Sequence, residues 1–110
     1  VTKLRSRAVS KSAIELTFTA PGTNGTRPPA AREYLVKQSL RPIRGRRDFS
    51  RARALCGGGC RFEITRVGTR IRMTITNLRP RTSYYYAAAA YDNISRRLGP
   101  RSATVRARTR

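Results

Sequence analysis

The stretch that most constrains what this chain can fold into runs from Asn77 to Tyr91 and reads NLRPRTSYYYAAAAY. From Tyr84 onward its side chains would alternate between two faces of a β-strand. One face would have Tyr84, Tyr86, Ala88 and Ala90, and the other would have Tyr85, Ala87, Ala89 and Tyr91. We expect the first set to point into a hydrophobic core and the second set to point outward.

The residues just before this strand predict a sharp corner. Pro80 has no N–H to donate, so the preceding strand must end before it. Leu78, Pro80, Thr82 and Tyr84 have the spacing of the corner that leads into a central strand of a β-sandwich. In such corners the tyrosine hydroxyl bonds back to nearby backbone. We therefore expect these four residues to have a structural role.

Six further segments have the short, alternating apolar pattern of half-buried strands. They are Leu4–Val9, Ala13–Thr19, Glu33–Ser39, Arg61–Thr65, Arg70–Thr76 and Ala103–Thr109. With the strand that begins at Tyr84 they make seven, which is the number expected of an all-β sandwich. A chain of 110 residues has the size of one domain, so we expect a single domain over residues 1–110.

Three segments between these strands are predicted to be connections. In residues 23–31, Pro28 and Pro29 favour a stiff loop over the tight hairpin that Asn24-Gly25 alone would suggest. One short helix is expected near residues 48–55, because Asp48 can cap a helix in which Phe49, Ala52 and Leu55 share a face. Residues 92–102 have the composition of a long loop.

The charge of the chain is unusual. There are 25 basic residues against 5 acidic ones, a formal net charge of +20, and 22 of the basic residues are arginine. Such a charge attracts polyanions such as nucleic acid, anionic glycans and wall polymers. The arginines are dispersed, however, with no run longer than two. Dispersed charge also fits a solvated surface whose composition reflects codon usage. The sequence leaves both interpretations open.

The residue inventory argues against an enzyme. There is no histidine to transfer protons near neutral pH, and the five acidic residues lie scattered among arginines that would keep them ionised. A zinc site needs about four ligands, and the chain offers only two cysteines. We expect no catalytic residue, no metal and no cofactor. No apolar run approaches the ~18 residues of a membrane-spanning helix.

The two cysteines, Cys56 and Cys60, bracket three glycines. A redox motif would have two intervening residues at a helix start, whereas glycines leave the backbone free to bring two sulfurs together. We favour a disulfide over two buried free thiols, and with it an oxidising, extracytoplasmic setting. Closing so short a loop would stabilise the domain by only about 2 kcal/mol, so its role would be local.

The outward face of the strand from Tyr84 is the candidate binding face. Tyr85 and Tyr91 would lie beside Arg106, Arg108 and Leu35 of neighbouring strands. Arginine stacks on tyrosine rings, and such a strip suits a neighbouring domain or a sugar ring. The alternative is that the arginines lie across the tyrosines and complete the surface themselves.

The chain resembles a fibronectin type III domain over nearly its whole length. The residues concerned are Leu4, Ile14-x-Leu16-x-Phe18-x-Ala20-Pro21, Tyr34-x-Val36, Leu78-x-Pro80-x-Thr82-x-Tyr84, and Gly99-Pro100-x-Ser102 to Thr109. Phe18 stands where this family usually has a core tryptophan. The segments Ser39-x-x-Pro42-Ile43 and Asp48-Phe49-x-x-Ala52, with the Tyr-Tyr-Tyr-Ala strand, resemble more narrowly the bacterial secreted branch.

The resemblance implies a seven-stranded, immunoglobulin-like β-sandwich without catalytic activity. It implies a spacer or interaction domain of a larger secreted or surface protein, sometimes attached to a hydrolase such as a subtilisin-like protease. The expected partners are neighbouring domains or another protein, with the isolated domain monomeric. Because no initiator methionine or signal peptide is seen, the chain reads as a mature fragment or excised domain. Asn24 and Asn93 begin N-glycosylation patterns, which the bacterial resemblance argues are unused.

Overall fold

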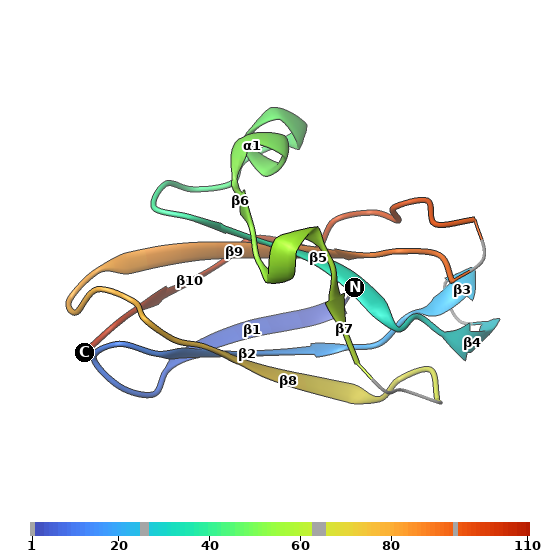
Figure 1. The fold of residues 1–110 in the computed structure, drawn as a ribbon, viewed down its shortest axis with the longest axis horizontal. Helices are drawn as coiled ribbons and strands as arrows, with labels where there is room; N and C mark the ends of the chain where they lie inside the picture. Colours follow the sequence, from blue (N-terminus) through green and yellow to red (C-terminus); the bar gives the residue numbers. More distant parts are fainter. Residues whose placement is uncertain (1, 25–26, 63–65, 94) are drawn as a thin grey trace.

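Two antiparallel β-sheets pack against each other, and a separate two-stranded ribbon of β3 and β4 lies beside them (Figure 1). A computed structural model describes residues 2–24, 27–62, 66–93 and 95–110. The smaller sheet has the order β1-β2-β8, and the larger has the order β10-β9-β5-β6, with β7 also paired to β5. The bounds are β1 Thr2–Ala8, β2 Ile14–Thr19, β5 Glu33–Ser39, β6 Arg53–Ala54, β7 Cys60–Arg61, β8 Arg70–Ile75, β9 Ser83–Ala90 and β10 Val105–Arg108.

The main core lies between the two sheets and follows the predicted alternation. Along β2, Ile14, Leu16 and Phe18 are buried, while the residues between them are half-buried. Tyr34 and Val36 of β5 face them from the larger sheet. At the centre Phe18, Tyr34 and Phe62 pack edge to face, with ring centroids 5.0 to 6.2 Å apart. Phe18 therefore contributes the aromatic ring that packs against Tyr34 and Phe62 in the main core.

The predicted corner is present where the chain passes from β8 into β9. The backbone N–H of Arg79 donates a hydrogen bond of 2.9 Å to the hydroxyl of Tyr84. Thr82 donates from its own hydroxyl to the carbonyl of Pro80 at 2.9 Å. Leu78 is buried against the core, and its N–H reaches the carbonyl of Ser12 in the turn after β1. These bonds fix where β9 begins and therefore which of its side chains face inward.

The prediction of a loop over residues 23–31 was wrong. Two short strands, β3 (Gly22–Asn24) and β4 (Arg27–Ala30), pair antiparallel, with Asn24 opposite Arg27. Pro28 and Pro29 lie in β4 between its two paired positions, where the register of the ribbon shifts, and prolines are tolerated at edge strands and at such irregularities. The two prolines therefore do not prevent pairing here. Of the predicted strand over Arg61–Thr65, Arg61 lies in β7 and Phe62 follows it outside any strand, while residues 63–65 lie outside the described ranges.

The expected helix over residues 48–55 is shorter and begins earlier. It is α1, Arg46–Arg51, with Gly45 as its N-cap. Asp48 lies in the first turn instead of capping, and its carboxylate accepts a 3.0 Å hydrogen bond from the N–H of Arg44. Beyond α1 the chain becomes extended, because β6 pairs with β5 and the N–H of Leu55 bonds to the carbonyl of Val36. Leu55 consequently packs against the main core and not beside Phe49.

Removing the Tyr84 hydroxyl should destabilise the domain through the corner alone. Tyr84→Phe leaves the half-buried N–H of Arg79 without its acceptor, and we expect a loss of about 1–2 kcal/mol in the free energy of unfolding, measured by urea denaturation. The matched control is Tyr85→Phe, because no described residue bonds to the hydroxyl of Tyr85. Equal stabilities of the two variants would contradict a structural role for the corner.

Candidate functional site

The outer face of the larger sheet is where the sequence predicts a binding surface. The register places Leu35 opposite Ala89, Lys37 opposite Ala87, and Arg106 opposite Tyr85. Side chains of directly opposed residues lie on the same face of a sheet. Leu35, Tyr85 and Arg106 therefore do share this face, as the alternation of the sequence predicts.

The centre of that face is not open, however. Ala87 and Ala89 are fully buried, at 0% exposure, although they point away from the main core. Ile43 and Phe49 pack directly on them and form a second, smaller hydrophobic cluster that also includes Leu35, Ala52 and Tyr85. The expectation of a continuous exposed strip along β9 was therefore wrong. Residues 40–52, here called the covering segment, lie across it and include α1 (Figure 1).

Polar contacts attach the covering segment to the sheet below it. The ammonium group of Lys37 donates to the carbonyls of Ser50 and Ala52, at 3.3 and 3.1 Å, and lies 5.7 Å from the ring centre of Phe49. The last carbonyls of a helix lack partners inside the helix, so this cation satisfies groups that would otherwise be orphaned. The hydroxyl of Thr104, just before β10, donates to the carbonyl of Ile43.

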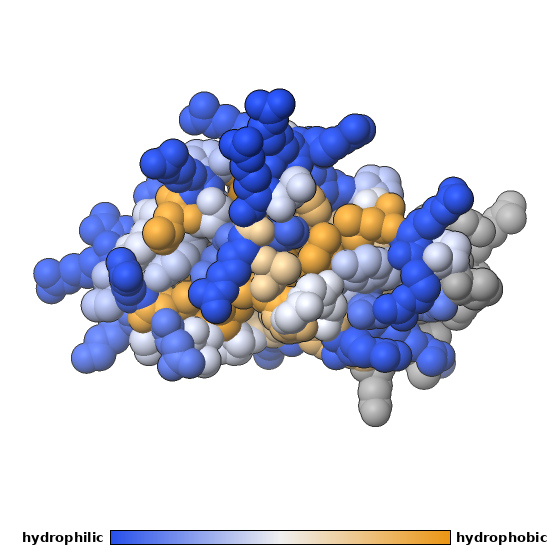
Figure 2. All heavy atoms as spheres, turned by 45° about the horizontal axis from the view of Figure 1, so that its top comes forward, coloured by the Kyte–Doolittle hydropathy of each residue, from blue (hydrophilic) through white to orange (hydrophobic). Residues whose placement is uncertain are grey.

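What remains accessible on this face is a patch beside the covering segment. Tyr85 and Leu35 are half-buried, while Arg106 and Arg108 on β10 are exposed. Arg106 stands directly opposite Tyr85, and Arg108 is opposite Ser83. We call Tyr85, Arg106 and Arg108 the Tyr85 patch and leave out Leu35, because it lies opposite Ala89, four residues farther along the sheet. Figure 2 shows the molecule from a side that presents α1, where apolar side chains are visible only in separate areas between charged ones.

Tyr91 lies apart from this patch. Six residues of extended chain separate it from Tyr85, a span of about 20 Å. Its hydroxyl donates a 3.0 Å hydrogen bond to the carbonyl of Gly58, in the loop between Cys56 and Cys60. The five residues of the predicted binding face therefore do not form one site: Tyr91 helps to hold the disulfide loop instead.

The predicted disulfide between Cys56 and Cys60 is present, with the two Cα atoms 5.2 Å apart. Gly57 and Gly58 have φ angles of 66° and 104°, a region that suits glycine. Cys60 is buried in the main core, whereas Cys56 is exposed. The bond therefore fastens an exposed turn to the interior beside β5.

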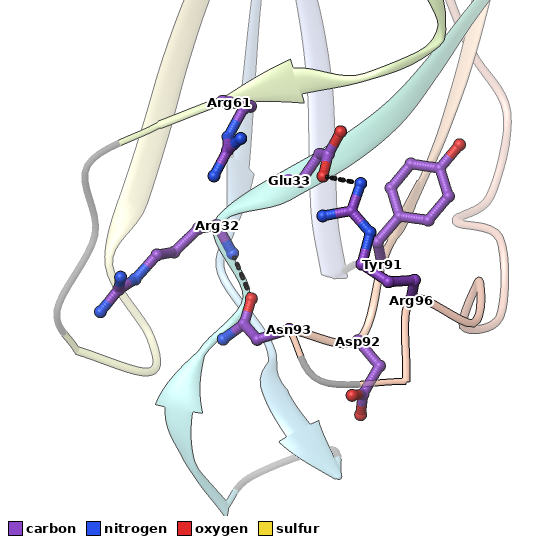
Figure 3. A pocket seen from close by; sticks show the side chains of 7 residues that line it. All are labelled: Arg32, Glu33, Arg61, Tyr91, Asp92, Asn93 and Arg96. Atoms are coloured by element: carbon purple, nitrogen blue, oxygen red, sulfur yellow. Dashed lines mark hydrogen bonds and ion pairs between the residues drawn. The ribbon is translucent and has the colours of Figure 1, made fainter.

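Next to this loop lies a small cavity of about 240 Å³ that the sequence did not suggest (Figure 3). Its lining is Arg32, Glu33, Arg61, Tyr91, Asp92, Asn93 and Arg96. Oε1 of Glu33 forms an ion pair of 2.7 Å with Nη2 of Arg96, and the N–H of Arg32 donates to the side-chain oxygen of Asn93. A side chain at Gly59 would overlap the carboxylate of Glu33. The sequence pattern did not predict this cluster, because its residues come from separate parts of the chain.

The described residues include two cysteines, which are joined in the disulfide, and no histidine. No group of three or more potential metal ligands occurs among them. Burial raises the pKa of the Tyr34 and Tyr86 hydroxyls, which keeps both neutral as hydrogen-bond donors to Ala31 and Gln38. Within the same part of the chain, no helix has the length and apolar character needed to cross a membrane. Both glycosylation patterns, at Asn24 and Asn93, include residues outside the described ranges.

Neither a scan of protein-family models nor a search of curated proteins finds a match for this chain. Solved structures do match. The chicken CNTN1 FN1-FN3 domains align with a TM-score of 0.66 and 18% identity, covering 99% of this chain and 31% of that one. This chain thus spans about a third of that structure's length.

A second match has the length of a single domain. It is the 6th fibronectin type III domain from human fibronectin type III domain containing protein 3, with a TM-score of 0.55 and 21% identity over 96% of this chain and 79% of that one. At these low sequence identities, the two structural matches support a shared fold. The chain has the immunoglobulin-like sandwich fold of fibronectin type III domains.

The covering segment should detach when its apolar anchor is removed. Phe49→Ala loses most of the contact with Ala87 and Ala89, so we expect a loss of about 2–4 kcal/mol in stability. Hydrogen exchange of the α1 amides should accelerate while the β9 amides stay protected. Ser50→Ala, an exposed change in the same helix, is the control. Unchanged protection of α1 in Phe49→Ala would contradict this account of the outer face.

Proposed function

We propose that this chain is a non-catalytic interaction module of a larger secreted or surface protein. The observation that most supports this is the Tyr85 patch, an aromatic ring beside two exposed guanidinium groups that form no ion pair within the described chain. Tyrosine and arginine are enriched in protein interfaces, where both give contact area and directed hydrogen bonds. Domains with this fold are generally modules of multidomain proteins.

The disulfide supports an extracellular location. Disulfides persist in oxidising compartments and are rare in the cytosol. The resemblance to bacterial secreted domains extends this proposal to a bacterial surface or secreted protein, including one in which the module is attached to a hydrolase. In that setting the domain acts as a spacer that also contacts its neighbour or an outside partner.

Polyanion binding is the second candidate, and the small number of ion pairs among the described residues favours it. The ion pairs given for the described side chains involve Arg7, Arg72 and Arg96. The other guanidinium groups keep their charge available to an anionic polymer such as a glycan, a wall polymer or nucleic acid. This candidate differs from the first because it depends on total charge and not on the Tyr85 patch.

The first proposal is tested by hydrogen exchange of the full-length protein against this chain alone. We expect the amides near Tyr85 and Arg106 to exchange more slowly in the full-length protein. Tyr85→Ser and Arg106→Ser should each weaken docking of the neighbouring domain or partner by about tenfold. Arg5→Ser is the matched control, since Arg5 is an exposed strand arginine on β1 of the opposite sheet. An unprotected Tyr85 patch in the full-length protein would contradict this proposal.

The second candidate is tested by a salt titration with heparin and with an oligonucleotide. If polyanion binding is the function, binding should persist at ~150 mM salt, and its logarithm should fall steeply with the logarithm of salt concentration. Arg5→Ser and Arg106→Ser should then weaken binding to a similar extent, because each removes one charge. Loss of all binding at ~150 mM salt would exclude this candidate as a physiological function.

A further inference from the structure

A larger groove opens at the other end of the sandwich, on the side where β8 and β6 are the last strands of their sheets. Its volume is about 660 Å³. One wall is formed by the end of β5, by Leu40 and Arg41, and by Arg53 and Leu55 around β6. The opposite wall is formed by Ile75 to Arg79, between β8 and the corner, and Tyr84 lies at the base. The predicted binding face does not include this groove.

The lining of the groove is partly apolar and accessible. Leu40 is 60% exposed, more than any other large hydrophobic residue of the described chain. Leu55 is half-buried beside it, and Ile75 and Leu78 form the deeper part. An exposed leucine that continues into a buried apolar floor offers surface that a ligand can remove from water.

The rim of the groove is positively charged. Arg41, Arg53 and Arg79 line it and are exposed, and no described acidic residue does so. None of these three arginines takes part in an ion pair within the described chain. An occupant with carboxylates would therefore meet unpaired guanidinium groups, which bind carboxylates through paired hydrogen bonds. A basic occupant would be repelled.

The strands beside the groove also have free edges. β8 pairs with β2 on one side, and no described strand pairs with its other side. β6 likewise has only β5 as a neighbour. Free strand edges present unpaired N–H and C=O groups, which an extended polypeptide can use by adding as a further strand. A glycan or nucleic acid has neither this backbone pattern nor apolar side chains for the floor.

We propose that the groove binds an extended acidic polypeptide segment in which apolar side chains alternate with carboxylates. The alternation matches the groove, because successive side chains of a strand point to opposite sides. The apolar ones would contact Leu40 and the floor, and the carboxylates would reach Arg41, Arg53 and Arg79. This inference rests on the proposed role as an interaction module and specifies the class of partner that this surface takes.

The experiment uses two labelled synthetic peptides of equal length and charge, one alternating glutamate and valine and the other alternating glutamate and glycine. Fluorescence anisotropy at ~150 mM salt measures the affinity of each. We expect the glutamate–valine peptide to bind at least tenfold more tightly. Leu40→Ser should weaken its binding about fivefold, and Arg53→Gln should weaken it about threefold. Leu98→Ser, at the 41% exposed leucine elsewhere, is the matched control and should change nothing.

Three results would overturn the proposal. They are equal affinity for the two peptides, equal effects of Leu40→Ser and Leu98→Ser, and failure of the glutamate–valine peptide to bind. Heparin competing as well as the peptide would assign the binding to total charge instead. If the Tyr85 patch is protected in the full-length protein while Leu40→Ser has no effect, the module role stands and only the groove is rejected. The reverse pattern would reject the Tyr85 patch and keep the groove.

Discussion

The pairing of β9 with β5 is the interaction on which both hydrophobic layers of this domain depend. On the inner side of these two strands, Tyr86 and Tyr34 lie in the main core. On the outer side, Ala87 and Ala89 lie under Ile43 and Phe49. A sandwich strand ordinarily has one face packed and one face in water. β9 is buried on both faces, and its run of small side chains is what makes room for the second layer.

This double burial explains which features the sequence could predict. Alternation places Tyr84, Tyr86 and Ala88 correctly, because the main core requires a face of period two and the corner at Pro80 sets its phase. The same alternation could not show that Ala87 and Ala89 are covered. Alanine is common on both buried and exposed surfaces, and the covering residue Phe49 lies in a separate segment with its own helical period. The sequence feature that could have indicated a second layer is Phe49, because a large aromatic side chain is usually buried against other apolar residues.

Other differences between the sequence-based predictions and the structure arise from the pairing of strands, which local composition does not determine. Pro28 and Pro29 disfavour a central strand, but they are compatible with the two-stranded ribbon of β3 and β4. The end of α1 is likewise set by a partner: Ala54 pairs with Lys37, and that requires an extended chain where local propensity allowed helix to continue. The cavity near Glu33 is lined by residues from three distant parts of the chain, so no local sequence pattern could predict it. The disulfide was predictable because glycines and thiols lie within one short segment.

The covering segment connects the two surfaces for which we propose a function. Its middle packs over β9 and leaves the Tyr85 patch at its side, while Leu40 and Arg41 at its beginning form part of the groove. Arg53 and Leu55, which follow its end, belong to the same wall of the groove. Anything that contacts Leu40 and Arg53 together therefore holds both ends of the segment. Binding there would reduce the opening of α1 from the sheet, because a ligand that favours the closed arrangement shifts the equilibrium by its difference in affinity for the two. An occupant of the groove would in this way be coupled to the contacts of Phe49 on the outer face.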